Sequence, residues 1–462
     1  MFLFFACLAP AIGFGTLFGA ATKGAIGTME MVSSTAFCGF IYAMTSAQPL
    51  TIIGSTGPVL AFVATLAQLA QALQLPFLPL YAWTGLWTAL ILFLSAVTSA
   101  SNLVKYLTRF TDEIFSVLIS AIFVVEAVSD IAKTFGTSTF TKALLTLTCA
   151  SVTFVTATTL KAFRSSFFFT KRVRKTVSNF GPTIGVVLGA MVARWARITH
   201  GTSLPSLSLP STFSTTSGRP WLVPLGDLPV WARWGSFIPA LMATVLLFLD
   251  QNITVRLVNN PAYKMKKGRQ EGQVLDGMHA DLLVVSLLTA GQSLVGFPWL
   301  VAATVRSISH VRALAQYEDK KVVKSTEQRV TGMGIHFLIG CCVLLDKPRQ
   351  LLRQIPLAVL MGLFMFLGTS ALSGNEMWER IVGLVQDKTM APAQRWTGLV
   401  PNKVTTFFTL LQIACLGAMF WVKESPIGVL FPIVIAMLAP LRFGLEKMGV
   451  IKKEYMDVLD QE

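Results

Sequence analysis

The chain is dominated by apolar stretches that are long enough to cross a bilayer and contain few charges. Charged residues make up 13% of the 462 residues, about half of the roughly 25% that is usual in soluble domains. About 20 consecutive apolar residues form a helix that spans the hydrocarbon core of a membrane. The sequence therefore predicts an all-α polytopic membrane protein and excludes an ordinary soluble fold.

Charged or Pro/Gly-rich breaks divide the chain into about fourteen apolar windows, which we interpret as transmembrane segments. These windows are residues 2–20, 29–47, 50–72, 78–98, 110–131, 142–161, 179–196, 235–257, 280–294, 299–316, 333–346, 352–372, 404–422 and 426–444. Gly or Pro interrupts the third and ninth windows, and the tenth carries Arg306 and His310, so these three are weak as ordinary spans.

Basic residues gather in the breaks between the windows and give the chain a net charge of +15. One cluster lies at 161–175 and another at 264–269, and neither contains an acid. Such clusters are typical of cytoplasmic loops under the positive-inside rule. The charge therefore predicts a lipid bilayer as the surroundings of the chain and no nucleic acid as a partner.

The windows fall into two halves on either side of a Ser/Thr/Pro/Gly-rich connection. We expect a first seven-span repeat at 1–196, a flexible extracellular linker at 197–230, a second repeat at 231–445 and a cytoplasmic tail at 446–462. Both halves contain a proline, a short apolar run and then small or hydroxyl residues, at Pro49–Gly57 and Pro298–Arg306. Inverted repeats of transporters leave weak similarity of this kind, although proline next to apolar residues is common in membrane proteins.

The two segments Pro49–Gly57 and Pro298–Arg306 together predict a binding site for an anion. Extended backbone at membrane depth is tolerated only where protein covers it or where it lines a cavity, and the amides that open a helix favour an anion. Arg306 would add a permanent charge whose planar fork suits an oxyanion. The alternative is that Arg306 marks a misplaced span boundary and contacts lipid headgroups.

Asp250 lies within an apolar span, and Thr254 follows it by four residues on the same helical face. An ionisable residue at this depth normally faces a cavity or a partner. Asp250 could bind a co-transported cation or proton and shape the local field, or it could pair with Arg306 structurally.

Other chemistries find no support in the sequence. The six cysteines lie in apolar stretches without a CxxC pair, so neither a disulfide framework nor a metal site is predicted. Nucleotide-binding and hydrolase motifs are missing as well. We therefore expect no catalytic residues, no cofactor and no enzymatic activity.

Several long motifs, in order along nearly the whole chain, resemble the bicarbonate-transporter and anion-exchanger family (solute carrier family 4). They are residues 4–15, 47–60, 248–254, 279–283, 297–310 and 327–332. The resemblance implies a seven-plus-seven inverted repeat with a core domain and a gate domain that often mediates dimerisation. It also implies that spans 3 and 10 are half-helices, with the anion between their N-termini and against span 8.

The resemblance assigns eight residues to the site. Substrate would contact Ser55, Thr56 and Gly57 on span 3 and Thr304, Val305 and Arg306 on span 10, while Asp250 and Thr254 on span 8 would couple an ion such as sodium or set the field. An arginine at the place of Arg306 resembles the electroneutral chloride/bicarbonate exchangers. An aspartate at the place of Asp250 resembles the sodium-coupled members. A borate-exporter segment of span 10 and the large N-terminal domain of animal members are absent from this sequence.

These observations predict a secondary transporter of bicarbonate or a similar small anion, with chloride/bicarbonate exchange by an elevator-type mechanism as the first hypothesis. Sodium-coupled bicarbonate cotransport and then borate efflux are the alternatives within transport. An anion channel or a transport-dead scaffold is the alternative outside it. From the family we expect a homodimer in the plasma membrane, and an organellar membrane would suit the same topology.

Overall fold

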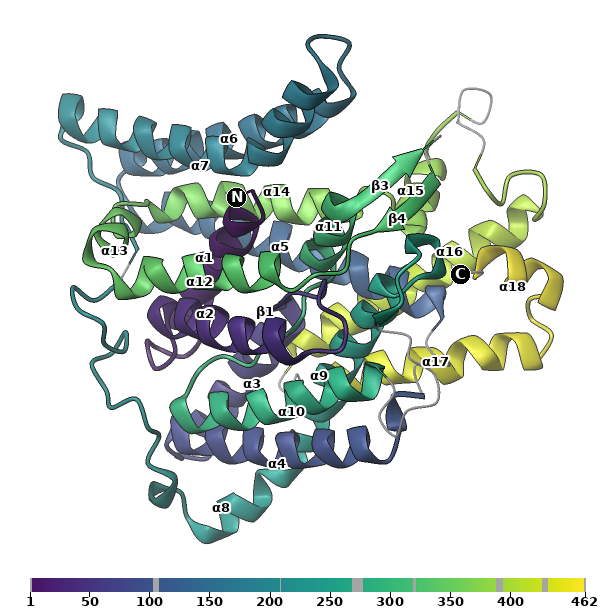
Figure 1. The fold of residues 1–462 in the computed structure, drawn as a ribbon, viewed down its shortest axis with the longest axis horizontal. Coiled ribbons are helices and arrows are strands. Elements are labelled where there is room, and N and C mark those ends of the chain that lie inside the picture. The colour runs from purple at the N-terminus through teal and green to yellow at the C-terminus, as the bar shows by residue number, and fades with distance from the viewer. Residues whose placement is uncertain are drawn as a thin grey trace.

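The structure is a computed structural model, and it describes residues 2–102, 108–207, 209–267, 277–318, 321–387, 394–425 and 431–460. Helices form nearly all of the regular structure, and the strands are short (Figure 1). The predicted all-α class is therefore confirmed.

The elements run in the following order. The first half contains α1 (Phe2–Ala21), α2 (Thr28–Thr45), β1 (Ile53–Gly54), α3 (Gly57–Ala72), α4 (Phe77–Val97), α5 (Arg109–Thr137), α6 (Phe140–Ala162), η2 (Phe163–Ser165) and α7 (Lys171–His200). After the linker come η3 (Leu225–Asp227), α8 (Val230–Gly235), α9 (Phe237–Val258), η4 (Pro261–Tyr263), α10 (Gly277–Val295), β2 (Val301–Ala302), α11 (Thr304–Leu314), β3 (Ala315–Glu318) and β4 (Lys321–Ser325). The chain ends with α12 (Val330–Leu344), α13 (Asp346–Leu352), α14 (Leu357–Leu372), α15 (Glu376–Gly383), α16 (Asn402–Glu424), α17 (Phe431–Lys447) and α18 (Lys453–Leu459).

Eight helices of the described chain are long and apolar enough to cross a membrane, or up to ten if each of two bent helix pairs is one span. Each predicted window contains a helix, but α3 has only 16 residues and α11 only 11. At 1.5 Å per residue these helices are about 24 and about 17 Å long, short of the roughly 30 Å of a hydrocarbon core. The half-helix character of these two windows follows, whereas fourteen crossings stay a prediction.

The helices pack in two groups. In the first group, α4 contacts α9 and α10, α2 contacts α1 and α12, and the half-helices α3 and α11 contact α1 and α9, respectively. In the second group, α6 contacts α7, α14 contacts α5 and α6, and both α16 and α17 contact α5. The groups meet where α1 contacts α7 and α14 and where α9 contacts α17. Here the rings of Phe14, Phe123 and Phe364 pack together, with centroids of Phe123 and Phe364 5.6 Å apart. The contact between the group that holds both half-helices and the other group is therefore apolar at this place.

The linker between the halves is tied to both helix groups. Leu207 donates its amide to Ile355 before α14, while Thr216 donates to Glu30 of α2. The Arg219 guanidinium donates to the carbonyls of Val295 and Gly296 after α10. The described part of the linker is thus pinned across one end of the molecule, which differs from the free loop that its composition predicts.

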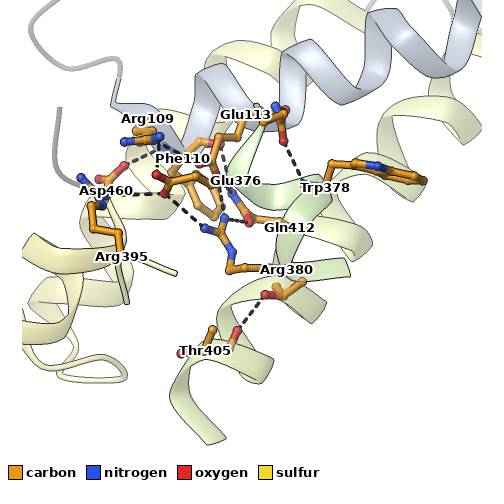
Figure 2. A network of polar contacts seen from close by, with 12 residues as sticks. Arg109, Phe110, Glu113, Glu376, Trp378, Arg380, Arg395, Thr405, Gln412 and Asp460 are labelled. Atoms are coloured by element: carbon orange, nitrogen blue, oxygen red, sulfur yellow. Dashed lines mark hydrogen bonds and ion pairs between the residues drawn. The ribbon is translucent and has the colours of Figure 1, made fainter. Parts of the chain in front are cut away.

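A buried polar network joins α5, α15 and α16 (Figure 2). Arg380 is 3% exposed, and its Nη2 donates to Glu113 at 2.5 Å and to Gln412 at 2.8 Å. Its guanidinium also lies 5.2 Å from the ring centroids of Trp396 and Phe408. Arg109 adds an ion pair of 2.6 Å to Glu376 of α15.

The C-terminal helix α18 packs against this network rather than extending away. Met456 and Leu459 are fully buried. Asp460 accepts the amide of Phe110 at 2.6 Å and pairs with Arg442 of α17. The described part of the predicted tail is therefore docked on the helices.

Candidate functional site

Two short strands meet at the centre of the first helix group and aim two helices at one place. β1 pairs antiparallel with β2, with Ile53 opposite Ala302 and Gly54 opposite Val301. Three residues after the end of β1, α3 begins at Gly57, and two residues after the end of β2, α11 begins at Thr304. The β-branched residues favour extended backbone, and the pairing satisfies groups that would otherwise be unpaired in the membrane.

Side chains complete the hydrogen bonding of the strands. Ser307 of α11 accepts the amide of Ile52 at 3.0 Å and donates to its carbonyl at 3.2 Å. Gln251 of α9 accepts the amide of Ala302 at 2.8 Å and donates to the Tyr42 hydroxyl at 3.0 Å. The crossing of the two half-helices is therefore braced from both sides.

Helix α9 contacts both half-helices through the two residues that the sequence singles out. Thr56 donates to Asp250 at 2.6 Å. One turn further, the Thr254 hydroxyl lies 2.6 Å from that of Thr304 and donates to the Ala302 carbonyl at 3.1 Å. Asp250 and Thr254 are both buried, and they serve different half-helices rather than one shared pair of ligands.

Arg306, half-buried on the first turn of α11, reaches the opposite half-helix. Its Nη2 donates to the Ser55 carbonyl at 2.9 Å. The guanidinium lies where a Cβ of residue 54 would be, so a larger residue there would displace it from this position. Within the described part of the chain, no carboxylate lies within 4.0 Å of Arg306. The alternative interpretation of Asp250, a structural pair with Arg306, is therefore not formed.

Donors at the opening of both helices remain free of side-chain caps. Thr56 at the N-cap of α3 donates to Asp250 and makes no cap, and Ala303 at the N-cap of α11 has no side chain that could. The Ser55 hydroxyl is buried without a hydrogen-bond partner among the described residues. Because Pro58 removes one amide from α3, α11 offers the larger set of backbone donors.

The structure thus brings the predicted residues together around the two helix openings. Ser55, Thr56 and Thr304 make the contacts described above, and Gly57 is buried at the start of α3. Val305 is 56% exposed, so its side chain points away from the packed crossing and only its backbone belongs to the helix opening.

Sequence reasoning missed three residues that shape the crossing: Gly54, Gln251 and Ser307. All three lie inside the motifs that carry the family resemblance. Gly54 alone had a local signal, since a glycine within a short β-favouring run indicates a close approach by another group. The partners of Gln251 and Ser307 lie more than 50 residues away, so no local pattern reveals them.

Paired half-helices with uncapped N-termini, and an arginine that has no acid partner among the described residues, place positive charge at the crossing. The comparison with known families agrees. The family described as the HCO3- transporter integral membrane domain matches residues 1–143 and 138–462. The chain therefore belongs to this family of transporters.

Curated relatives include an anion transport protein and a sodium bicarbonate exchanger. The mouse band 3 anion transport protein is 33% identical over 96% of this chain and 50% of its own length. The rat electroneutral sodium bicarbonate exchanger 1 is 34% identical over 96% of this chain and 46% of its own. The chain spans about half the length of these relatives.

Solved structures agree on the fold. The transmembrane domain of a cyanobacterial bicarbonate transporter, BicA, has a TM-score of 0.61 at 14% identity and covers 94% of this chain and 96% of its own. The structure of SLC26A9 has a TM-score of 0.58 at 13% identity, over 96% of this chain and 65% of that one. At these identities the likeness concerns the fold alone.

Proposed function

We propose that this chain is a secondary transporter that exchanges bicarbonate, or a similar small monovalent anion, for chloride. The observation that carries the proposal is Arg306, a cation at the crossing of two half-helices with no acid beside it among the described residues. A guanidinium has five N–H donors, and the hydrogen bond of Arg306 to the Ser55 carbonyl uses Nη2 alone. The donors that remain suit an anion.

In this proposal the anion lies between the openings of α3 and α11. The Arg306 guanidinium binds it with charge, and the backbone of Thr304 and Val305 adds amides at the positive end of a helix dipole. Ser55 donates its free hydroxyl, while Thr56 and Gly57 form the opposite wall.

Asp250 holds the half-helix α3 through Thr56 and places a carboxylate beside the anion site. Its charge sets the electrostatic field at the anion site. It is also the group that would bind a co-transported proton or sodium ion. Sodium ligation by Thr254 as well would require its hydroxyl to leave Thr304 and Ala302.

We further propose that the first helix group is the core domain and moves as an elevator against the second group, the gate domain. The apolar contact of Phe14, Phe123 and Phe364 supports this division, because rings without hydrogen bonds can slide past one another. Residues 1–196 and 231–445 would be the inverted repeats, joined by the extracellular linker 197–230 and followed by the tail 446–462. The gate domain would carry a homodimer contact in the plasma membrane.

Sodium-coupled bicarbonate cotransport is the second candidate, and Asp250 is the observation that favours it. The relatives do not decide between the two, because band 3 and the sodium bicarbonate exchanger are 33% and 34% identical to this chain. Borate efflux is the third candidate.

The test is bicarbonate uptake into proteoliposomes, followed by internal pH, with internal chloride and external sodium varied independently. Exchange predicts uptake that saturates with bicarbonate, requires internal chloride and does not depend on external sodium. Uptake that requires external sodium would contradict exchange and favour cotransport. The absence of bicarbonate flux under either gradient would make borate efflux the favoured candidate.

A channel and a scaffold are tested in the same vesicles. A channel would pass chloride without a counter-anion and without saturation. A scaffold would show no flux, and loss of Arg306 and Asp250 together would leave its partner binding unchanged. Either result would overturn the proposal.

A further inference from the structure

The connection between α6 and α7 presents three phenylalanine rings to the outside. Phe167, Phe168 and Phe169 are 101%, 73% and 72% exposed. Figure 1 shows this connection projecting from the molecule at the end that also carries the β3–β4 hairpin and α18. Exposed aromatic clusters of this kind mark an interaction site or a membrane contact. We call residues 163–175 the aromatic–basic loop.

The loop is held in a defined conformation. Arg174 donates from Nη1 to the carbonyl of Phe169 at 2.8 Å, and Ser166 accepts the amide of Phe168 at 3.2 Å. Phe169 has φ of +62°, in the left-handed region that a bulky residue rarely adopts. Contacts within the loop therefore keep a strained backbone that turns the rings outward.

The loop is also strongly and uniformly positive. It contains Arg164, Lys171, Arg172, Arg174 and Lys175, and the sequence has no Asp or Glu from residue 131 to residue 226. In the described chain, none of these five side chains has a carboxylate within 4.0 Å. Four of them occupy the first turns of α7, where positive charge opposes the helix dipole. Helix stability therefore does not explain them.

Its position indicates the partner. The loop joins two helices that are long and apolar enough to cross a membrane, so it lies at the bilayer surface. Aromatic rings prefer the interface between headgroups and acyl chains, and clusters of four to eight basic residues beside a transmembrane helix attract anionic lipids. We propose that the aromatic–basic loop is a docking site for anionic phospholipids, with the rings in the interface and the five basic side chains on lipid phosphates and carboxylates.

The second basic cluster provides a matched control. Lys264, Lys266 and Lys267 are exposed, but the amides of Lys266 and Lys267 donate to Glu327 at 2.6 and 2.8 Å. The carboxylate of Glu327 therefore lies beside this cluster, and the proposal expects the cluster to contribute little to lipid binding.

The experiment compares the binding of phosphatidylserine and phosphatidylcholine to the purified full chain by native mass spectrometry with lipid titration. The variants are K171Q/R172Q/K175Q, F167S/F168S/F169S and the control K264Q/K266Q/K267Q. Arg174 is left in place because it holds the loop. Gel filtration and thermal unfolding verify that each variant is folded.

We expect the wild type to prefer phosphatidylserine. Each basic residue near an anionic surface contributes about 1 kcal/mol, so the triple basic variant should bind phosphatidylserine about a hundredfold more weakly. The phenylalanine variant should weaken both lipids about equally, and the control should lose less than about threefold. Equal binding of both lipids by the wild type, or an equal loss in the control, would overturn the proposal. So would unchanged lipid binding by a basic variant that instead loses a protein partner.

Discussion

Two arginines inside this membrane protein have opposite surroundings. Arg380 contacts Glu113 and Gln412 and lies near Glu376 (Figure 2). Its guanidinium also packs beside the rings of Trp396 and Phe408. Arg306 makes one hydrogen bond, to the Ser55 carbonyl, and meets no carboxylate within 4.0 Å in the described chain. Both are cations in surroundings where charge is costly.

The difference separates a structural charge from one held ready for a ligand. Nearby acids neutralise Arg380, so its removal would leave Glu113 buried without its cation. Arg306 keeps free donors at the opening of a helix, where its charge is only neutralised by something that enters. The comparison therefore predicts that the first arginine affects folding and the second affects transport.

The largest expected effect is the loss of stability in Arg380→Met. Breaking one side of a buried ion pair costs about 3–5 kcal/mol, and we expect a much lower unfolding temperature and little folded protein by fluorescence-detected gel filtration. Lys133→Gln is the control, because its ion pair with Asp130 is exposed and contributes about 0.2–1 kcal/mol. An Arg380→Met variant as stable as the wild type would remove the contrast.

Arg306→Gln should be nearly as large an effect but on transport alone. Hydrogen bonds to charged groups contribute about 1.5–3 kcal/mol each, so we expect chloride-dependent bicarbonate uptake to fall at least about tenfold in proteoliposomes. The unfolding temperature should stay close to that of the wild type, since no acid loses its partner. Full uptake by correctly folded protein would show that Arg306 is not a ligand.

Gly54→Ala sharpens the comparison because it moves Arg306 without changing any charge. A Cβ at residue 54 would occupy the place of the guanidinium, so we expect uptake to fall by about tenfold, with a raised KM for bicarbonate. Gly291→Ala is the control, because nothing lies within 4 Å of a Cβ on that residue of α10. Equal activities of the two alanine variants would place the guanidinium elsewhere in the working protein.

Ser307→Ala should have the smallest effect. It leaves the amide and carbonyl of Ile52 without their side-chain partner, which costs about 1–3 kcal/mol of stability. We expect a modest fall in unfolding temperature and an unchanged KM, measured in the same preparations. A raised KM with unchanged stability would mean that Ser307 contacts the anion.

Much of this site could be predicted from the sequence, because membrane depth makes exceptions conspicuous. Gly, Pro and Arg306 mark three apolar windows as weak spans, and two of these windows hold the half-helices α3 and α11. The third prediction was wrong, because the window at 280–294 holds α10, which is long and apolar enough to cross a membrane. Asp250 and Thr254 were predicted to share a helix face, which α9 confirms. Their division between Thr56 and Thr304 was not predictable, because it depends on how three helices distant in sequence cross.

The charged network at α15 had no local signal. Arg380 finds Glu113 267 residues away and Gln412 32 residues away, so no pattern along the chain links them. The linker illustrates the same limit: its composition indicates a loop, whereas contacts such as Leu207 with Ile355 appear only when both helix groups are in place.

The most direct test of the central claim is whether an anion stabilises the protein through Arg306. The measurement is the unfolding temperature of the wild type and of Arg306→Gln as bicarbonate or chloride replaces gluconate at constant ionic strength. A ligand at ten times its Kd adds about 1.4 kcal/mol of stability. The account predicts a saturable rise in the wild type that is lost in the variant, and an equal rise in both proteins would contradict it.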